Sequence, residues 1–497
     1  MKQKCIAVFD VGKSNKKILL YDNNLNILDS LYETFNEFSD GGVNYEPIGE
    51  ITQWFFDSMM KLSSLYDIEA VSVTAHGATF VCVDKNGEIT VPVLSYTTDP
   101  GEDFHTDFYQ KFGNADTLHK KYLTPKMPGL GCMAKAIYFC SLNYKKDYER
   151  THVILNFPQY FGFLLTGKHG AEYTYMGNHT YLWDFEKNDY SFMVDKLGIR
   201  GKLPEKISAP WDVLGTVSGE ASKRCGLSED TVVTMGIHDS NASLLPYLVS
   251  MKDNFVLNSS GSVMVAMRKS EKLEIGDNDL GKALLYNCNV FSDPVRTAIF
   301  LAGLEFDLYV GQLRAVHEMG ELPLFNREIF ELIINEKKLF IIPSIIPIGI
   351  LPSSSAKIIE GGTVYTFGDI SAGNRPDFFN DMDTAYAVLC LSLAIHTMMA
   401  IKQVGLEKGD TVYIEGGFRK NDSFMSVLSA LLPDNPVSLS NLEEATSFGA
   451  AVLARSAISR KSLADMKDSF SIETQEVSKP DFTGVDNYVE EFMKYTI

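Results

Sequence analysis

The sequence predicts an α/β protein made of two similar halves, and three observations support this prediction. Strands and amphipathic helices alternate through the first half of the chain. A strand, turn and strand over residues 5–22 recur in similar form over residues 254–270, as expected of a duplicated fold. No Pro-rich or low-complexity linker separates the halves. We therefore predict an N-terminal domain over residues 1–245, a C-terminal domain over residues 246–497, and a hinge near residues 240–255.

The elements of the first half follow from the spacing of apolar residues and from turn chemistry. Residues 5–22 predict two apolar strands around a turn at Gly12. Apolar residues at helical spacing predict a helix over 46–66, and residues 68–90 predict two buried strands joined by a His-Gly turn. Residues 153–168 predict the end of a strand and then a helix, with a proline in the first turn of the helix and a glycine after its last turn.

The same signals predict the elements at the junction of the two halves and those of the second half. Over residues 231–248 a β-branched strand ends at a glycine, and Asp239 or Ser240 is expected to cap the helix that follows. The second half then predicts a hairpin, a long helix, a strand and two further helices, over residues 254–270, 381–403, 411–417, 421–432 and 443–459. The last helix carries Gly449 followed by two alanines, small residues that allow another backbone to approach closely.

Composition and charge exclude several classes of protein. A hydrophobic fraction of 45% and a mean hydropathy of -0.04 are typical of a globular chain. The net charge of -19 disfavours nucleic acid or an anionic membrane as a partner. Seven cysteines without a C-x-x-C motif predict buried thiols in a reducing compartment, for which the cytoplasm fits best. The apolar segment 339–352 is short and broken by prolines, so no membrane-spanning segment is expected.

The glycine turns of the two predicted hairpins indicate a site for a phosphorylated ligand. Such turns expose consecutive backbone N–H groups that can hold an anion, and two facing turns could hold the phosphates of a nucleotide. Asp10, at the end of the first strand, would then serve as a ligand for Mg²⁺, because a carboxylate repels phosphate unless a cation lies between them. The alternative is a plain hairpin with Asp and Asn as turn formers. No G-x-G-x-x-G follows the first strand, which disfavours an NAD enzyme.

Seven short motifs resemble, in this order, the landmarks of the FGGY carbohydrate kinases, a branch of the actin-like ATP-binding superfamily. They are DVGKSNKK, TAHG, FPQYFGFLLTG, GIHDSNAS, NSSGS, IEGGFRKND and EATSFGAAVLA. Each motif is weak alone, but together they extend over residues 4–458 in the family's order. The resemblance implies two ribonuclease-H-like (actin-like) domains flanking a deep catalytic cleft, with sugar on the N-terminal side, ATP on the C-terminal side and Mg²⁺ between them.

The resemblance also implies roles for individual residues. Asp239 falls on the family's catalytic aspartate, the base that accepts the proton of the attacking sugar hydroxyl; the alternative is a plain helix cap. Sugar contacts are implied for His76, Gly77, Asp99, His238 and Asp239, and Mg²⁺ contacts for Asp10 and Asp239. ATP contacts are implied for Gly12, Lys13, Ser14, Lys17, Ser260, Gly261, Ser262, Gly416, Gly417 and Asn421.

Departures from the family pattern leave the substrate open. Lys13 stands where the family usually has Thr, and Tyr96 stands where it usually has Trp. The motifs DVGKSN and HDSNAS resemble the corresponding motifs of kinases for 6-deoxyketoses such as L-rhamnulose or L-fuculose, so we expect an ATP-dependent ketose kinase. The alternatives are a pentulose (xylulose-type) kinase and a non-catalytic actin-like protein that uses nucleotide to gate sensing or assembly. The expected partners are a sugar substrate and ATP. The sequence leaves the oligomeric state undecided, with a homodimer as one alternative.

Overall fold

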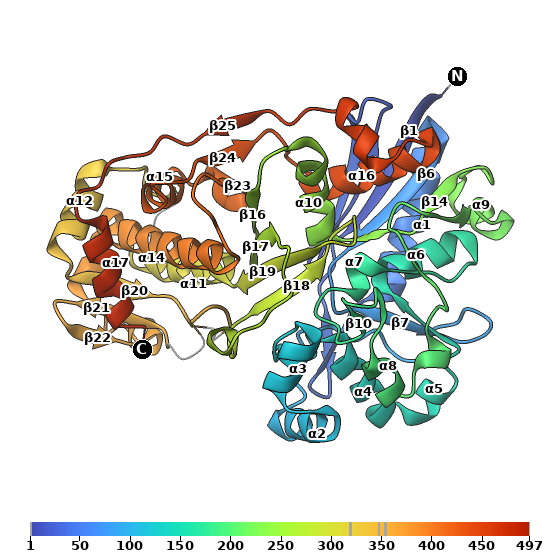
Figure 1. Cartoon of the computed structure of the whole chain (residues 1–497), viewed down its shortest axis with the longest axis horizontal. Coiled ribbons are helices and arrows are strands. Elements are labelled where there is room, and N and C mark those ends of the chain that lie inside the picture. The colour runs from blue at the N-terminus through green and yellow to red at the C-terminus, as the bar shows by residue number, and fades with distance from the viewer. Residues whose placement is uncertain (1, 318–320, 346–347, 352–354, 497) are drawn as a thin grey trace.

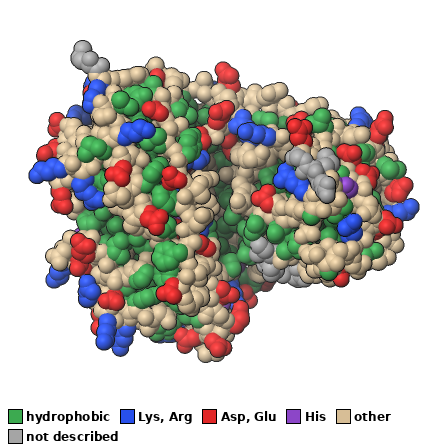
Figure 2. Space-filling model, turned by 180° about the vertical axis from the view of Figure 1, so that it is seen from behind, with side chains coloured by type: hydrophobic (Ala, Val, Ile, Leu, Met, Phe, Trp, Pro, Cys, Tyr) green, Lys and Arg blue, Asp and Glu red, His purple; other side chains and the backbone are tan. Residues whose placement is uncertain are grey.

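The chain forms two α/β lobes, one from each half, which meet at a central junction (Figure 1). The computed structural model describes residues 2–317, 321–345, 348–351 and 355–496. Figure 2 shows the same lobes from behind, with acidic and basic side chains interspersed over that face. The predicted α/β class is confirmed.

A seven-stranded mixed sheet forms the base of the N-terminal lobe. Its strands are β1 (Gln3–Val11), β2 (Asn15–Tyr21), β3 (Ile27–Thr34), β6 (Tyr66–Ala75), β13 (Val213–Thr216), β14 (Val232–Thr234) and β15 (Ile237–His238). Their order is β13-β14-β6-β1-β2-β3, with β15 also paired to β6. Strand β1 runs antiparallel to β2 and parallel to β6, so the predicted hairpin lies at the centre of the sheet.

The C-terminal lobe repeats this sheet. Its strands are β16 (Phe255–Ser260), β17 (Met264–Lys269), β18 (Leu284–Cys288), β19 (Pro294–Phe300), β23 (Thr411–Gly416), β24 (Val437–Ser440) and β25 (Thr474–Glu476), in the order β18-β19-β17-β16-β23-β24-β25. Strand β16 is antiparallel to β17 and parallel to β23, as β1 is to β2 and β6. The duplication inferred from the two hairpins is therefore present in the order and direction of the central strands.

The N-terminal lobe also contains helices and short strands, some of which pack on the sheet while others form a second core beside it. The helices are α1 (Ile48–Leu65), α2 (Glu102–Phe112), α3 (Ala115–Tyr122), α4 (Met133–Asn143), α5 (Lys145–Glu149), α6 (Phe157–Thr166), α7 (Tyr173–Met176), α8 (Phe192–Lys196) and α9 (Gly219–Cys225). The short strands are β4 (Phe38–Asp40), β5 (Val43–Tyr45), β7 (Phe80–Val83), β8 (Val153–Asn156), β9 (Ala171–Glu172), β10 (Trp183–Asp184), β11 (Asp189–Tyr190) and β12 (Ile207–Ser208). Helix α6 has the predicted proline in its first turn and ends at Gly167, whose φ of 71° favours glycine.

The C-terminal lobe is organised around one long apolar helix, α14 (Met382–Gln403). Around it lie α11 (Ala302–His317), α12 (Arg327–Glu336), α13 (Phe367–Ser371), α15 (Asp422–Leu431), α17 (Val485–Lys494) and the strands β20 (Leu339–Ile342), β21 (Lys357–Glu360) and β22 (Thr363–Tyr365). Among the described residues, α14 alone is long and apolar enough to cross a membrane, and 89% of its most apolar window is buried inside the protein. It is therefore the core helix of this lobe. Part of the apolar segment 339–352 lies outside the described residues.

Two helices form the junction between the lobes, α10 (Asp239–Ser250) and α16 (Ala445–Ser459) (Figure 1). Although α16 comes from the second half of the chain, its alanines share a core with Ile6 and Val8 of β1. An ideal Cβ on Gly449 would lie 1.9 Å from the carbonyl oxygen of Ala242. The small residues of α16 thus allow the close approach that the sequence predicts, and the approach is to α10.

A second contact joins the lobes on the side of α3. The Nε2 atom of His119 lies 2.7 Å from the carbonyl oxygen of Leu284, and the N–H of Tyr286 donates to the carbonyl of Leu123 at 3.0 Å. His119 is buried. The two lobes are therefore bridged at α3 as well as at the α10–α16 junction.

All seven cysteines are buried and none forms a disulfide. Burial raises the pKa of the Cys82 thiol to about 12, which keeps it protonated and unreactive at neutral pH. The prediction of buried, unpaired thiols is confirmed.

Candidate active site

Glycines at the second hairpin turn allow three backbone segments to meet. The turn after β16 contains Ser260 and Gly261, and an ideal Cβ on Gly303 would lie 2.1 Å from the carbonyl oxygen of Gly261. Gly416 has a φ of 82°, and its ideal Cβ would lie 2.1 Å from the carbonyl oxygen of Ser260. A side chain at either glycine would push the backbone apart, so the local sequence permits a turn packed against α11 and the end of β23.

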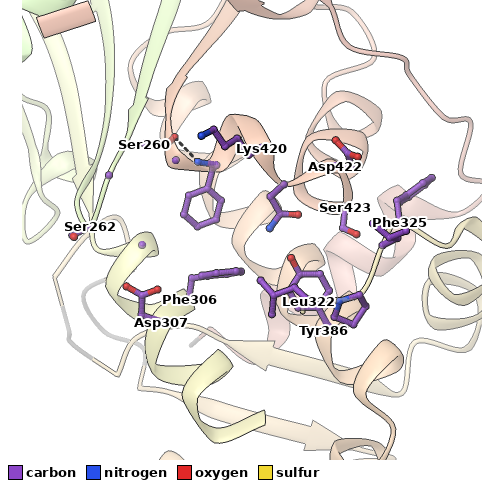
Figure 3. Close-up of a pocket in the computed structure, with 17 residues that line it drawn as sticks. Ser260, Ser262, Phe306, Asp307, Leu322, Phe325, Tyr386, Lys420, Asp422 and Ser423 are labelled. Carbon is purple, nitrogen blue, oxygen red and sulfur yellow. Dashed lines mark hydrogen bonds between the residues drawn. The ribbon is translucent and has the colours of Figure 1, made fainter. Parts of the chain in front are cut away.

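A cavity of about 520 Å³ opens beside this turn (Figure 3). Of the predicted nucleotide residues, five line it: Ser260, Gly261, Ser262, Gly417 and Asn421. The Ser260 hydroxyl oxygen accepts a hydrogen bond from the backbone N–H of Phe418 at 3.2 Å, and it donates to the carbonyl of Glu415. Gly416 does not line the cavity but packs behind Ser260. The structure therefore brings the two C-terminal motifs together around one space.

Several residues of this cavity were missed from the sequence. Phe306 and Asp307 come from α11, Tyr386 comes from α14, and the segment 322–325 supplies three apolar side chains and a proline. These residues come from two helices and one loop and belong to no local motif. Several aromatic rings with a small number of polar groups are typical of pockets for flat organic ligands.

Two lysines of the first hairpin, Lys13 and Lys17, are paired with carboxylates of the protein. Lys13 Nζ lies 2.8 Å from a carboxylate oxygen of Glu37, is paired with Glu46, and donates to the hydroxyl of Ser95 at 2.6 Å. Lys17 Nζ is paired with Glu444 at 2.8 Å, next to the start of α16. The Lys13 side chain is thus committed to the N-terminal lobe.

Gly12 and Ser14 complete the first turn. An ideal Cβ on Gly12 would lie 2.9 Å from the carbonyl oxygen of Asn15, which makes glycine the best fit there. Ser14 is exposed, and its carbonyl accepts a hydrogen bond from the N–H of Phe35 at 3.1 Å. Both residues keep the turn short and open at its outer face.

Asp10 is a buried carboxylate at the junction of the lobes. It is 6% exposed, and its Oδ2 accepts a hydrogen bond from the hydroxyl of Ser447 in α16 at 3.0 Å. Burial raises the pKa of Asp10 to about 6, Lys17 and Ser447 oppose the rise, and the charge of Asp239 adds to it. The charge of Asp239 therefore acts on the carboxylate of Asp10.

Asp239 is the first residue of α10 and follows β15 directly. The helix cap is His238, which makes no side-chain cap bond, so the prediction of an Asp239 or Ser240 cap is corrected by one residue. Asp239 Oδ1 accepts from the backbone N–H of Ser240 at 2.6 Å, and the side chain is 31% exposed. Burial raises the pKa of Asp239, and His76 opposes the rise. A carboxylate of this kind can reach a ligand and accept a proton.

Three histidines gather beside Asp239. His76 directly follows β6, His238 Nε2 lies 3.3 Å from Asp239 Oδ1, and the centroid of the His179 ring lies 6.2 Å from that of His238. An ideal Cβ on Gly77 would lie 2.8 Å from ring atoms of both His179 and His238, so only glycine fits between them. Burial lowers the pKa of His76 to about 4, that of His179 to about 4 and that of His238 to about 3. All three rings are neutral at pH 7.

Asp99 is separated from this cluster. Its carboxylate is exposed, accepts from the N–H of Gly101 at 3.0 Å and lies 3.7 Å from Nε2 of His105. It lines a different cavity, of about 420 Å³, between α3 and the C-terminal lobe. Tyr96, three residues earlier, is the side chain that meets His76, at 5.5 Å between ring centroids. A turn closed by the bond from Thr98 N–H to the Ser95 carbonyl separates the two positions.

The two similar lobes form the two-domain fold of the actin-like type, and matches to family models identify the class of protein. The N-terminal domain of the FGGY family of carbohydrate kinases matches residues 5–246. The C-terminal domain of carbohydrate kinase FGGY matches residues 252–462. The chain therefore belongs to the FGGY family of carbohydrate kinases.

Known proteins that this chain resembles are distant in sequence. L-fuculokinase of Escherichia coli (strain K12) is 24% identical over 293 residues, which span 55% of this chain and 58% of that protein. A carbohydrate kinase from Novosphingobium aromaticivorans superposes with a TM-score of 0.77 at 21% identity, over 100% of this chain and 98% of the other. A xylulose kinase from Lactobacillus acidophilus superposes with a TM-score of 0.79 at 15% identity, over 99% of this chain and 97% of the other. A gluconate kinase from the same organism superposes with a TM-score of 0.80 at 16% identity, over 99% of this chain and 96% of the other. These similarities establish the fold.

Proposed function

We propose that the protein is an ATP-dependent carbohydrate kinase that transfers the γ-phosphoryl group of ATP to a hydroxyl of a ketose. The observation that carries the proposal is the position of Asp239, a partly exposed carboxylate at the start of α10, between the histidine cluster and Asp10. Membership of the FGGY family supports the reaction type. We propose 6-deoxyketoses such as L-rhamnulose or L-fuculose as the first substrates to test, and pentuloses as the second. The partial match to L-fuculokinase supports the former, and the fold of xylulose kinases the latter.

In this proposal the chemistry is divided between the lobes. The adenosine lies in the cavity beside Gly417 and Asn421, and its phosphates reach the turn at Ser260–Ser262. Asp239 accepts the proton of the sugar hydroxyl as that oxygen attacks the γ-phosphorus, with the bond to the β-phosphate oxygen breaking in line. Burial raises the pKa of Asp239, so its carboxylate binds a proton more strongly than an exposed aspartate does, which suits a general base.

Asp10 and Asp239 would hold Mg²⁺. Both offer carboxylate oxygens, and Mg²⁺ in phosphoryl-transfer sites is bound by one or two carboxylates together with phosphates and water. Among the described residues, no three His, Cys, Asp or Glu side chains are grouped to hold a metal by themselves, which is compatible with such a site. A cation bound there would neutralise charge on the phosphates during transfer.

A coupled assay of ADP release against a panel of ketoses, polyols and aldonates tests this function. We expect turnover with at least one ketose, and a loss of about 10²–10⁴ in turnover for Asp239→Asn, the range for removing a general base. Asp99→Asn is the matched control, because Asp99 lies in the other cavity and its loss should leave turnover within about twofold of wild type. An active Asp239→Asn variant would reject the catalytic role.

The alternative proposal is a non-catalytic actin-like protein that binds nucleotide. ATP binding without phosphorylation of any sugar in the panel would favour this alternative. We further propose a cytoplasmic location, supported by the seven unpaired, buried thiols.

A further inference from the structure

His179 is a half-buried residue whose ring orientation is set by the backbone. It follows α7 with a φ of 40°, and its Nδ1 lies 2.9 Å from the carbonyl oxygen of Gly131. A carbonyl oxygen only accepts hydrogen bonds, so Nδ1 carries the hydrogen. Because burial keeps the ring neutral, with a pKa of about 4, Nε2 carries a lone pair and acts as an acceptor.

The carbonyl that orients His179 is itself firmly held. Lys135 in α4 is fully buried and donates to the carbonyls of Met127 and Gly129, in the loop that contains Gly131. The N–H of Leu130 donates to the carbonyl of Thr98 at 3.0 Å. A buried lysine that binds only carbonyl groups is costly, and here it fixes the loop against which the His179 ring is set.

The free nitrogen of His179 faces the histidine cluster. Its Nε2 would lie 2.8 Å from a Cβ built on Gly77, and among the described residues none forms a hydrogen bond with it. His76 has the same arrangement, because its Nδ1 lies 3.2 Å from the Gly77 carbonyl and its Nε2 is buried without a partner in the described part of the chain. Two ring nitrogens next to the same turn therefore present unused acceptors near Asp239.

Charge around the cluster is already balanced within the protein. The two lysines whose charges act on His76 are Lys13 and Lys16. Both are paired with the buried carboxylate of Glu46, and Lys13 is also paired with Glu37. No cation of this group is left over to neutralise an anionic ligand. An uncharged ligand with hydroxyl groups can donate hydrogen bonds to the Nε2 atoms of His179 and His76 without disturbing this charge balance. A carboxylate carries no hydrogen to donate, so the lone pairs of these nitrogens would repel it.

We propose that His179 Nε2 accepts a hydrogen bond from a hydroxyl of the substrate, and that this side of the site selects an uncharged polyhydroxy compound over a sugar acid. The inference rests on the proposed function, since it places the sugar beside Asp239. His179 was not singled out from the sequence, where it lies in no motif of the family.

The test is a binding experiment that does not depend on turnover. Titration calorimetry of the full chain would measure the affinity for a panel of ketoses, polyols and aldonates without ATP, in wild type and in His179→Asn. Asparagine tolerates a positive φ, and its amide N–H can replace the Nδ1–H bond to Gly131 while removing the Nε2 acceptor. His152→Asn is the matched control, because His152 is an exposed histidine outside the site.

We expect an uncharged sugar to bind wild type and the His152→Asn control alike, and to bind His179→Asn about fivefold to tenfold more weakly, as for one lost hydrogen bond. One monodeoxy analogue of that sugar should bind wild type more weakly than the sugar does, by the same factor of about five to ten. The same analogue and the sugar should bind His179→Asn with equal affinity, because the hydrogen bond is already lost in that variant. Circular dichroism and thermal unfolding of each variant would show that the fold is retained.

Three outcomes would overturn the inference: no uncharged sugar binds wild type, an aldonate binds as tightly as the best ketose, or His179→Asn binds that ketose as wild type does. Failure of the proposed function is distinguishable. If the sugar binds in a His179-dependent way but ADP is not released in the kinase assay, the inference on recognition stands and the kinase proposal fails.

Discussion

Replacing Gly449 by alanine tests the close packing on which the junction of the lobes depends. An ideal Cβ at this position would lie 1.9 Å from the carbonyl oxygen, 2.7 Å from the carbonyl carbon and 3.2 Å from the Cα atom of Ala242. All three atoms are backbone, so no side-chain rotation can relieve the overlap, and α16 must move away from α10. Such overpacking costs about 3 kcal/mol, at the upper end of its usual range, while alanine regains about 1 kcal/mol of helix propensity.

The expected net loss of stability is about 2 kcal/mol, or about 4–8 °C in thermal midpoint for a lobe of this size. Turnover should fall as well, because α10 begins with Asp239 and α16 carries the hydroxyl bonded to Asp10. The matched control is Gly311→Ala in α11, a helical glycine whose ideal Cβ has nothing within 4 Å. That variant should gain about 0.5–1 kcal/mol. Scanning fluorimetry and urea unfolding measure both, and a Gly449→Ala protein as stable as wild type would refute the reasoning.

Three further predictions concern charge and motion. Asp10→Asn keeps the shape of the side chain and the hydrogen bond from Ser447 but removes the carboxylate charge. It should therefore weaken Mg²⁺-dependent ATP use more than it weakens binding of ATP without metal. Equal losses would indicate that Asp10 is only a turn residue. Burial raises the pKa of Glu172 to about 8 from 4.5, so the folded state binds more protons than the unfolded state between these pH values. The stability contributed by Glu172 is therefore present below pH 4.5 and is lost as the pH rises toward 8. The Glu172→Gln variant should lack this pH dependence of the unfolding free energy, measured by urea unfolding across about pH 5–8. A correct sugar should make the protein more compact in small-angle scattering and accelerate ATP consumption far above its sugar-free rate, and an unchanged profile with equal ATP consumption would contradict closure of the lobes.

Much of the fold could be predicted because local patterns determine it. Apolar periodicity located α1 and α15, a long apolar run that begins at an acid located α14, and the recurrence of a strand, turn and strand located the two central hairpins. Helix α14 is buried on nearly all sides and is not amphipathic. These signals are short in range, since the 2.0 and 3.6 residue periods are properties of one strand or one helix. The order of the motifs then identified the family, which the matches over residues 5–246 and 252–462 confirm.

The pattern of the sequence did not predict which side chains meet. Asp99 and Tyr96 are three residues apart, yet a turn sends one to an exposed cavity and the other to His76. Lys13, expected at the phosphates, is drawn to Glu37 and Glu46 because two carboxylates from other segments lie within reach.

For the same reason, the cavity beside the second hairpin turn and the histidine cluster could not be predicted from the sequence and were decided by the tertiary structure. Phe306 and Tyr386 meet across helices α11 and α14, and His179 meets His238 across 58 intervening positions. The sequence by itself determined which elements form, how the two halves repeat, and where the acid at the start of α10 lies along the chain. Only the packing of α16 from the second half against the first sheet decided that Asp10, Ser447 and Asp239 share one junction, because contacts between distant segments leave no period in the sequence.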